Sequence, residues 1–196
     1  MTLLGRQHPV RRADTRVPGE EGIWVFVLGD MAVFALFFGT FMFSRGRNPE
    51  QFAAGHAALS VPLGTVNTVL LLTSSLLVAL GVARAQVHGS DTRRLFLGAL
   101  GCGVGFVVVK ALEWSHLFIA GIAVGTSEYF SYYFMFTGIH LAHVVIGLII
   151  LGRLIAQSGQ HLLTEKQHRF FETGGIFWHM VDLLWVVLFA LFYLVR

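Results

Sequence analysis

The chain has 196 residues, of which 55% are hydrophobic and only 13% are charged. Soluble domains carry about 25% charged residues, so this composition excludes an ordinary soluble fold and favours a membrane protein. The formal net charge is +3, and the single cysteine, Cys102, excludes an intramolecular disulfide. No basic surface interleaved with aromatic residues is evident, so we expect no nucleic-acid partner.

Five apolar runs make up most of the sequence. They cover residues 22–43, 62–83, 95–118, 132–154 and 174–195. Each reaches the roughly 20 residues that cross the hydrocarbon as a helix, and a helix satisfies its own backbone hydrogen bonds where water is absent. The sequence therefore predicts an all-α integral membrane bundle of five transmembrane helices, with a tail at residues 1–21 and one membrane domain at residues 22–196.

Basic residues predict the orientation of this bundle. If the N-terminus starts inside, most of them fall on the inner side, namely Arg6, Arg11, Arg12, Arg16, Arg84, Arg93, Arg94, Arg153, Lys166 and Arg169. Only Arg45, Arg47 and Arg196 fall on the outer side. Cytoplasmic loops carry an excess of Lys and Arg, so we expect a cytoplasmic N-terminus and an external C-terminus.

Polar residues inside the apolar runs are the candidate functional residues. They are Asp30, Asn67, Lys110, Glu113, His140, His143, His179 and Asp182. A charge in hydrocarbon costs roughly 3 kcal/mol on insertion scales, so each of these groups must face protein, a lipid headgroup or water.

Spacing predicts which of these residues meet. Lys110 and Glu113 have opposite charge and stand one helical turn apart, as do His179 and Asp182, so each pair is expected to interact locally. His143 lies on the polar stripe of the fourth run. Its estimated depth differs from that of Asp30 by only about 5 Å at the helical rise per residue, which predicts that Asp30 and His143 approach each other.

The HxxH step of His140 and His143 raises the possibility of a metal site. Two imidazoles on one helical face can share a metal, with His179 or Asp182 completing the shell. Histidines in membrane helices more often bond to neighbouring helices, and no GxSxG, CxxC or HExxH motif is present. We therefore expect no metal site, no catalytic residue and no cofactor bound by this chain.

Five segments, one in each run, resemble subunit III of the haem-copper oxidases. They read GIWVFVLGD at 22–30, NTVLLLTSS at 67–75, KALEW at 110–114, FTGIHLAHVVIG at 136–147 and ETGGIFWHMVDLLW at 172–185. The resemblance implies a subunit of the cell's inner (plasma) membrane that has no redox centre and packs beside a catalytic subunit holding haem and copper. It also implies bound phospholipid and support of proton uptake.

The resemblance also suggests roles for single residues. Asp30 occupies the place of a buried family carboxylate that is usually glutamate, and Glu113 matches a second one. Lipid-binding or proton-related roles are accordingly expected of Asp30, Glu113, His140 and His143. Structural roles are expected of Asn67, Lys110, His179 and Asp182.

Many family members have seven helices, and this chain starts at what looks like the third. The short form and the Gly-Asp-Met segment at 29–31 are similar to NorE-type proteins associated with nitric oxide reductase, and short chains of cytochrome c and quinol oxidases are the alternatives within the family. From a different class, a self-standing small transporter or proton-conducting bundle would use Asp30, His143 and Asp182 as its path. A helical scaffold without chemistry is the third reading.

Overall fold

The computed structural model describes residues 18–86, 91–158 and 164–195, and these residues form helices and no strand. The elements are α1 (Glu21–Arg47), α2 (Pro49–Ala57), α3 (Val61–Gln86), α4 (Thr92–Ile119), α5 (Glu128–Gln157), α6 (Glu165–Phe189) and the π-helix η1 (Ala190–Leu194). Five of them, α1, α3, α4, α5 and α6, are long and apolar enough to cross a membrane. The predicted all-α, five-span class is confirmed. The arginines of the predicted tail lie outside the described residues.

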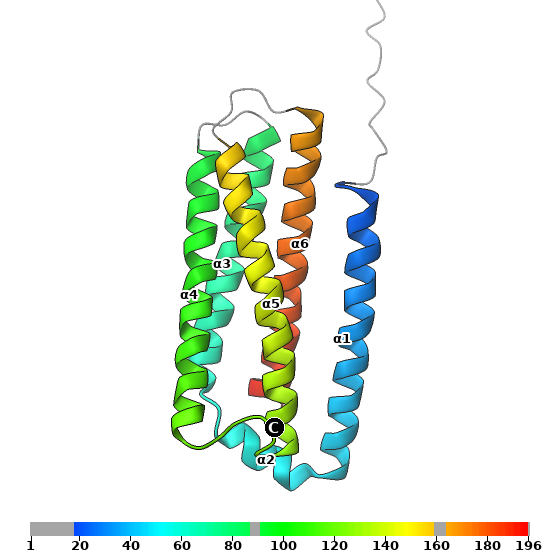
Figure 1. Ribbon diagram of the computed structural model, residues 1–196, viewed down its shortest axis with the longest axis vertical. Coiled ribbons are helices and arrows are strands. Elements are labelled where there is room, and N and C mark those ends of the chain that lie inside the picture. Colours follow the sequence, from blue (N-terminus) through cyan, green and yellow to red (C-terminus); the bar gives the residue numbers. More distant parts are fainter. Residues whose placement is uncertain (1–17, 87–90, 159–163, 196) are drawn as a thin grey trace, which may run out of the picture.

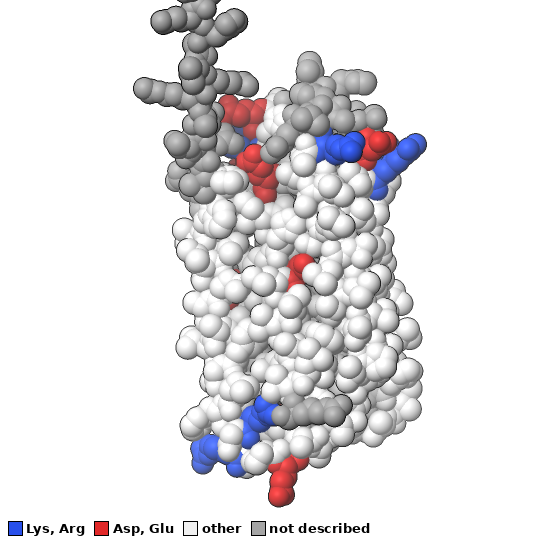
Figure 2. Space-filling view, turned by 180° about the vertical axis from the view of Figure 1, so that it is seen from behind, with Lys and Arg blue, Asp and Glu red and all other residues white. Residues whose placement is uncertain are grey.

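The long helices stand side by side, and α1 begins at the opposite end of the bundle from η1 (Figure 1). The α6 helix is central, since it contacts α1, α3 and α5, and α3 packs extensively against α4. The α1 helix stands at the edge. On the face that Figure 2 shows, most charged side chains gather at the two ends and leave a broad, nearly uncharged band between them, as a bundle surrounded by hydrocarbon requires.

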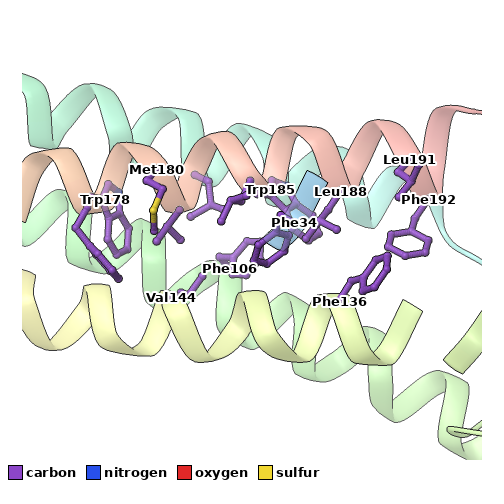
Figure 3. Packing of buried hydrophobic residues seen from close by; sticks show 14 of the residues in the cluster. Phe34, Phe106, Phe136, Val144, Trp178, Met180, Trp185, Leu188, Leu191 and Phe192 are labelled. Atoms are coloured by element: carbon purple, nitrogen blue, oxygen red, sulfur yellow. The ribbon is translucent and has the colours of Figure 1, made fainter. Parts of the chain in front are cut away.

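The core of the bundle is rich in aromatic residues, and Trp178 of α6 is one of them (Figure 3). A Cβ atom added at Gly147 of α5 would lie 2.6 Å from the Trp178 ring, and one at Gly103 of α4 would lie 3.0 Å from it. Glycine at these two positions therefore makes room for the indole where α4, α5 and α6 meet. Close packing of this kind is how membrane helices associate, because lipid removes the hydrophobic drive between them.

The short helix α2 was not predicted. Pro49 occupies its first turn, where a missing N–H costs nothing. Phe52 is buried against Phe41 and Tyr129, with ring centroids 5.2 and 5.7 Å away. The α2 helix thus closes one end of the bundle, beside the start of α5.

Two long helices begin earlier than their apolar runs. Ser127 accepts a hydrogen bond from the Phe130 amide and caps α5, and Thr164 forms a capping box with Gln167 before α6. Such caps satisfy backbone N–H groups in polar sequence, so the helices extend beyond the hydrocarbon. Asp182 consequently lies past the middle of α6.

Candidate functional site: buried polar contacts between the helices

The predicted pair of Lys110 and Glu113 is confirmed. Both are on α4 and are 1% and 3% exposed, and the Lys110 Nζ atom lies 2.8 Å from Glu113 Oε2. The ammonium donates two further hydrogen bonds of 3.0 Å, to the hydroxyls of Tyr133 on α5 and Tyr193 on η1. These three acceptors use all three donors of the ammonium. The charge is thus compensated inside the protein.

Tyr193 and Trp185 complete this lysine cluster, which consists of Lys110, Glu113, Tyr133, Trp185 and Tyr193. The Tyr193 hydroxyl donates to Glu113 Oε1 at 2.6 Å, and the Lys110 ammonium lies 4.8 Å from the centre of the Trp185 ring. A cation over an indole face is attracted by its negative quadrupole. The cluster therefore ties α4 to α5, α6 and η1.

Sequence reasoning missed Tyr193. The backbone of η1 is held by side chains of other elements, since Tyr129 donates to the Phe192 carbonyl at 3.1 Å and His56 Nε2 lies 3.0 Å from the Tyr193 carbonyl. Terminal helix carbonyls lack partners within the helix, and α2 and α5 supply them here. The available signal was a single phenol in an otherwise apolar last turn.

Asp30 of α1 and His143 of α5 meet as predicted. Asp30 Oδ1 lies 3.3 Å from His143 Nε2, and both side chains are nearly buried. His143 Nδ1 lies 2.9 Å from the Ile139 carbonyl, and a carbonyl only accepts, so Nδ1 carries a proton. The contact between Nε2 and Oδ1 is then a hydrogen bond only when a second proton sits between them. This contact is therefore a polar tie between α1 and α5 that needs a proton on one of the two atoms.

His140 does not share the surroundings of His143. It is fully buried, with Phe106 and Trp185 at ring-centroid distances of 5.6 and 5.5 Å, and neither ring nitrogen has a hydrogen-bond partner among the described residues. Asn67 of α3 is likewise fully buried, and its amide has no partner within the same described part of the chain. The described ranges contain no group of three potential metal ligands. The two histidines of the HxxH step thus face different neighbours.

His179 and Asp182 of α6 lie close together beside α3. His179 Nδ1 lies 2.6 Å from the Ser75 hydroxyl of α3, and the Asp182 carboxylate lies within electrostatic reach of both Ser75 and His179. The three side chains therefore form one small polar group between α3 and α6. Asp182 contacts α3 while Asp30 and His143 join α1 to α5, so the three residues of the transporter hypothesis are not gathered in one cluster.

Comparison with known proteins identifies the family to which this helical bundle belongs. Residues 15–195 match the family model described as cytochrome c oxidase subunit III. Cytochrome c oxidase subunit 3 of Corynebacterium diphtheriae is 31% identical over 89% of this chain and 87% of its own length. The corresponding subunit of Bacillus subtilis is 30% identical over 88% of this chain and 84% of its own length.

A third relative joins two subunits in one polypeptide. The haem-copper oxidase subunit I+III of Aeropyrum pernix is 31% identical over 89% of this chain, which spans only 22% of that longer protein. The five spans and the bacterial relatives place the chain in the plasma membrane as a multi-pass protein. The family match extends over all five membrane helices, and the chain therefore belongs to the subunit III family of the haem-copper oxidases.

Proposed function

We propose that the chain is a non-catalytic membrane subunit that packs beside a haem-containing catalytic subunit, which holds the haem and copper. The family match across all five helices carries this proposal. The poorly buried α1 helix supports it, because Val25, Leu28 and Leu36 are 76%, 68% and 71% exposed, and so does the fusion of subunits I and III in the Aeropyrum pernix relative. A partner or lipid must cover such a face.

Purification in a mild detergent tests the partnership. We expect haem absorbance to travel with the tagged chain, together with a larger polypeptide in a fixed ratio. Recovery of an isolated oligomer without haem would contradict the proposal, and proton movement by that oligomer in liposomes would establish the self-standing transporter instead.

Within the family, we propose that the partner is a nitric oxide reductase, as for NorE-type proteins. The similarity of the Gly-Asp-Met segment at 29–31 to NorE-type proteins supports this choice. Activity of the same purified complex distinguishes the two terminal electron acceptors. A nitric oxide reductase consumes nitric oxide under anaerobic conditions, whereas an oxidase consumes oxygen.

We also propose that the chain binds phospholipid at the end of the bundle closed by α2. A cavity of about 600 Å³ lies there, lined mainly by apolar residues of α2 and the start of α3, with Arg45 at its wall. A cation beside an apolar cavity suits a phosphate headgroup with its attached chain. Mass spectrometry of the purified complex should find retained phospholipid, and Ala53→Trp, which fills the cavity, should reduce it.

We propose that Asp30 and His143, whose side chains meet at 3.3 Å within the membrane span, take part in proton uptake. Asp30→Asn keeps the size of the side chain and can still bond to His143 Nε2, but an amide does not exchange the shared proton. We expect this variant to assemble normally while the turnover of the complex falls more steeply towards alkaline pH than in the wild type. The measurement is acceptor consumption at a series of pH values.

Asp30→Leu separates this role from a purely structural one. It removes the polar tie of α1 to α5, and we expect a loss of about 1 kcal/mol in helix association as well as the same defect in turnover. Normal assembly and activity of Asp30→Leu would refute any role for the pair.

A further inference from the structure

The outward face of α6 carries a histidine within the uncharged band. The α6 helix lies between α1 and α3 and is mostly buried, yet His179 is exposed and Leu183, one turn further on, is 50% exposed. An ionisable side chain that faces acyl chains is expensive. Figure 2, which shows the side of the molecule away from the view of Figure 1, has small acidic patches within this nearly uncharged band.

The bundle leaves this polar group partly unsatisfied. Ser75 occupies Nδ1 of His179, while no hydrogen bond to Nε2 is found among the described residues. Asp182 is only 7% exposed, and its Oδ1 atom has no partner within that part of the chain. A lipid tail offers neither a donor nor an acceptor, whereas a polar side chain on a neighbouring helix offers both.

The spacing of the surface fits a helix. His179, Leu183 and Val186 follow each other at steps of four and three residues, the spacing of a helix-packing seam. Leu72 and Leu76, which flank Ser75 on α3, are 49% and 59% exposed and widen the surface. A single polar position in an apolar seam sets the register of the partner helix, because only one alignment satisfies it.

We propose that this α6 seam, formed by His179, Leu183 and Val186 with the flanking leucines of α3, docks a transmembrane helix of the haem-carrying subunit. This proposal rests on the partnership proposed above. The relative in which subunits I and III are fused is the reason for choosing the haem-carrying subunit as the docked partner. The docked helix presents a hydroxyl or amide side chain that bonds to the Nε2 atom of the exposed His179. The surface is therefore a register-setting contact inside the membrane.

Photo-crosslinking in the assembled complex tests the location. A photo-reactive phenylalanine analogue replaces Leu183, and matched controls carry it at Ile146 or Ile149 on α5, which are 48% and 59% exposed. We expect a crosslink to the haem-carrying subunit from position 183 and a much weaker one from the controls. Crosslinks to that subunit only from the controls, or a crosslink from position 183 to a second copy of this chain, would overturn the proposal. Absence of haem from the purified sample would instead overturn the partnership itself.

Substitution of His179 tests the hydrogen bond. His179→Leu should reduce the partner recovered per chain about fivefold, the effect expected of one hydrogen bond between membrane helices, and His179→Gln should restore most of it. The melting temperature of the isolated chain serves as the folding control. Unchanged recovery of the partner with both variants would overturn the assigned contact, whatever the crosslinks show.

Discussion

Replacement of Lys110 with methionine should cost the chain about 3–5 kcal/mol of stability, because it leaves the buried carboxylate of Glu113 without its countercharge. The lysine is 1% exposed and makes three hydrogen bonds inside the bundle, so no water can take its place without opening the helix contacts. The measurement is thermal unfolding of the isolated chain in detergent, followed by loss of the monodisperse species.

The matched double variant, Lys110→Met with Glu113→Gln, distinguishes the charge from the packing. Replacement of a whole buried ion pair by neutral groups of similar volume is often close to neutral, so the double variant should recover most of the lost stability. A double variant as unstable as Lys110→Met would show that packing, rather than charge compensation, determines the effect. Tyr193→Phe should cost less, about 1–3 kcal/mol, because it removes only one hydroxyl shared by the pair.

Gly147→Ala should cost about 1–3 kcal/mol, the usual range for an overpacked core. Its Cβ would lie 2.6 Å from the ring of Trp178, and Trp178 is 1% exposed and surrounded by three helices. Thermal unfolding in detergent again reports the loss.

Gly152→Ala is the control for helix propensity. Gly152 lies on the same helix, and a Cβ added there would meet no atom of the described residues within 4 Å apart from its own stretch of helix. Alanine favours a helix by up to about 1 kcal/mol over glycine, so this variant should be neutral or slightly stabilised. Equal effects of the two variants would contradict the assigned contact with Trp178.

The membrane helices could be predicted from the sequence because their physical requirement is local. A run of about 20 apolar residues is enough to cross the hydrocarbon, and every such run became a long helix. The α2 helix has only nine residues of mixed polarity, and its burial depends on Phe52 meeting Tyr129, which is distant in sequence. No local pattern announces such a contact.

The polar contacts likewise divide into those that local sequence predicts and those that depend on how the helices pack. Lys110 and Glu113 are one turn apart on one helix, so their pairing follows from spacing alone. The contact of Asp30 with His143 followed from depth, because two polar groups at similar depth in hydrocarbon favour each other. The hydrogen bond between His179 and Ser75 depends on the relative rotation of α3 and α6. Helix packing determines this rotation, and the positions of the apolar runs do not encode it.

Tyr193 was missed for a different reason. It lies in a π-helix, where the Val195 amide donates to the carbonyl of Ala190 at 3.0 Å. In a π-helix the backbone hydrogen bonds span five residues instead of the four of an α-helix. This extra residue changes the face of the helix on which later side chains lie. Extrapolation of the α-helical period from α6 therefore does not place the Tyr193 hydroxyl beside Lys110.

The position of Tyr193 has a consequence for biogenesis. Lys110 and Glu113 leave the ribosome well before the segment that contains η1, so during membrane insertion they have only each other and nearby α4 atoms as partners. Because Lys110 and Glu113 lie one turn apart and neutralise each other's charge, α4 can enter the bilayer before the last span is made. Closure of the cluster by the Tyr193 phenol then couples the arrival of the last span to the locking of helices that were inserted long before it.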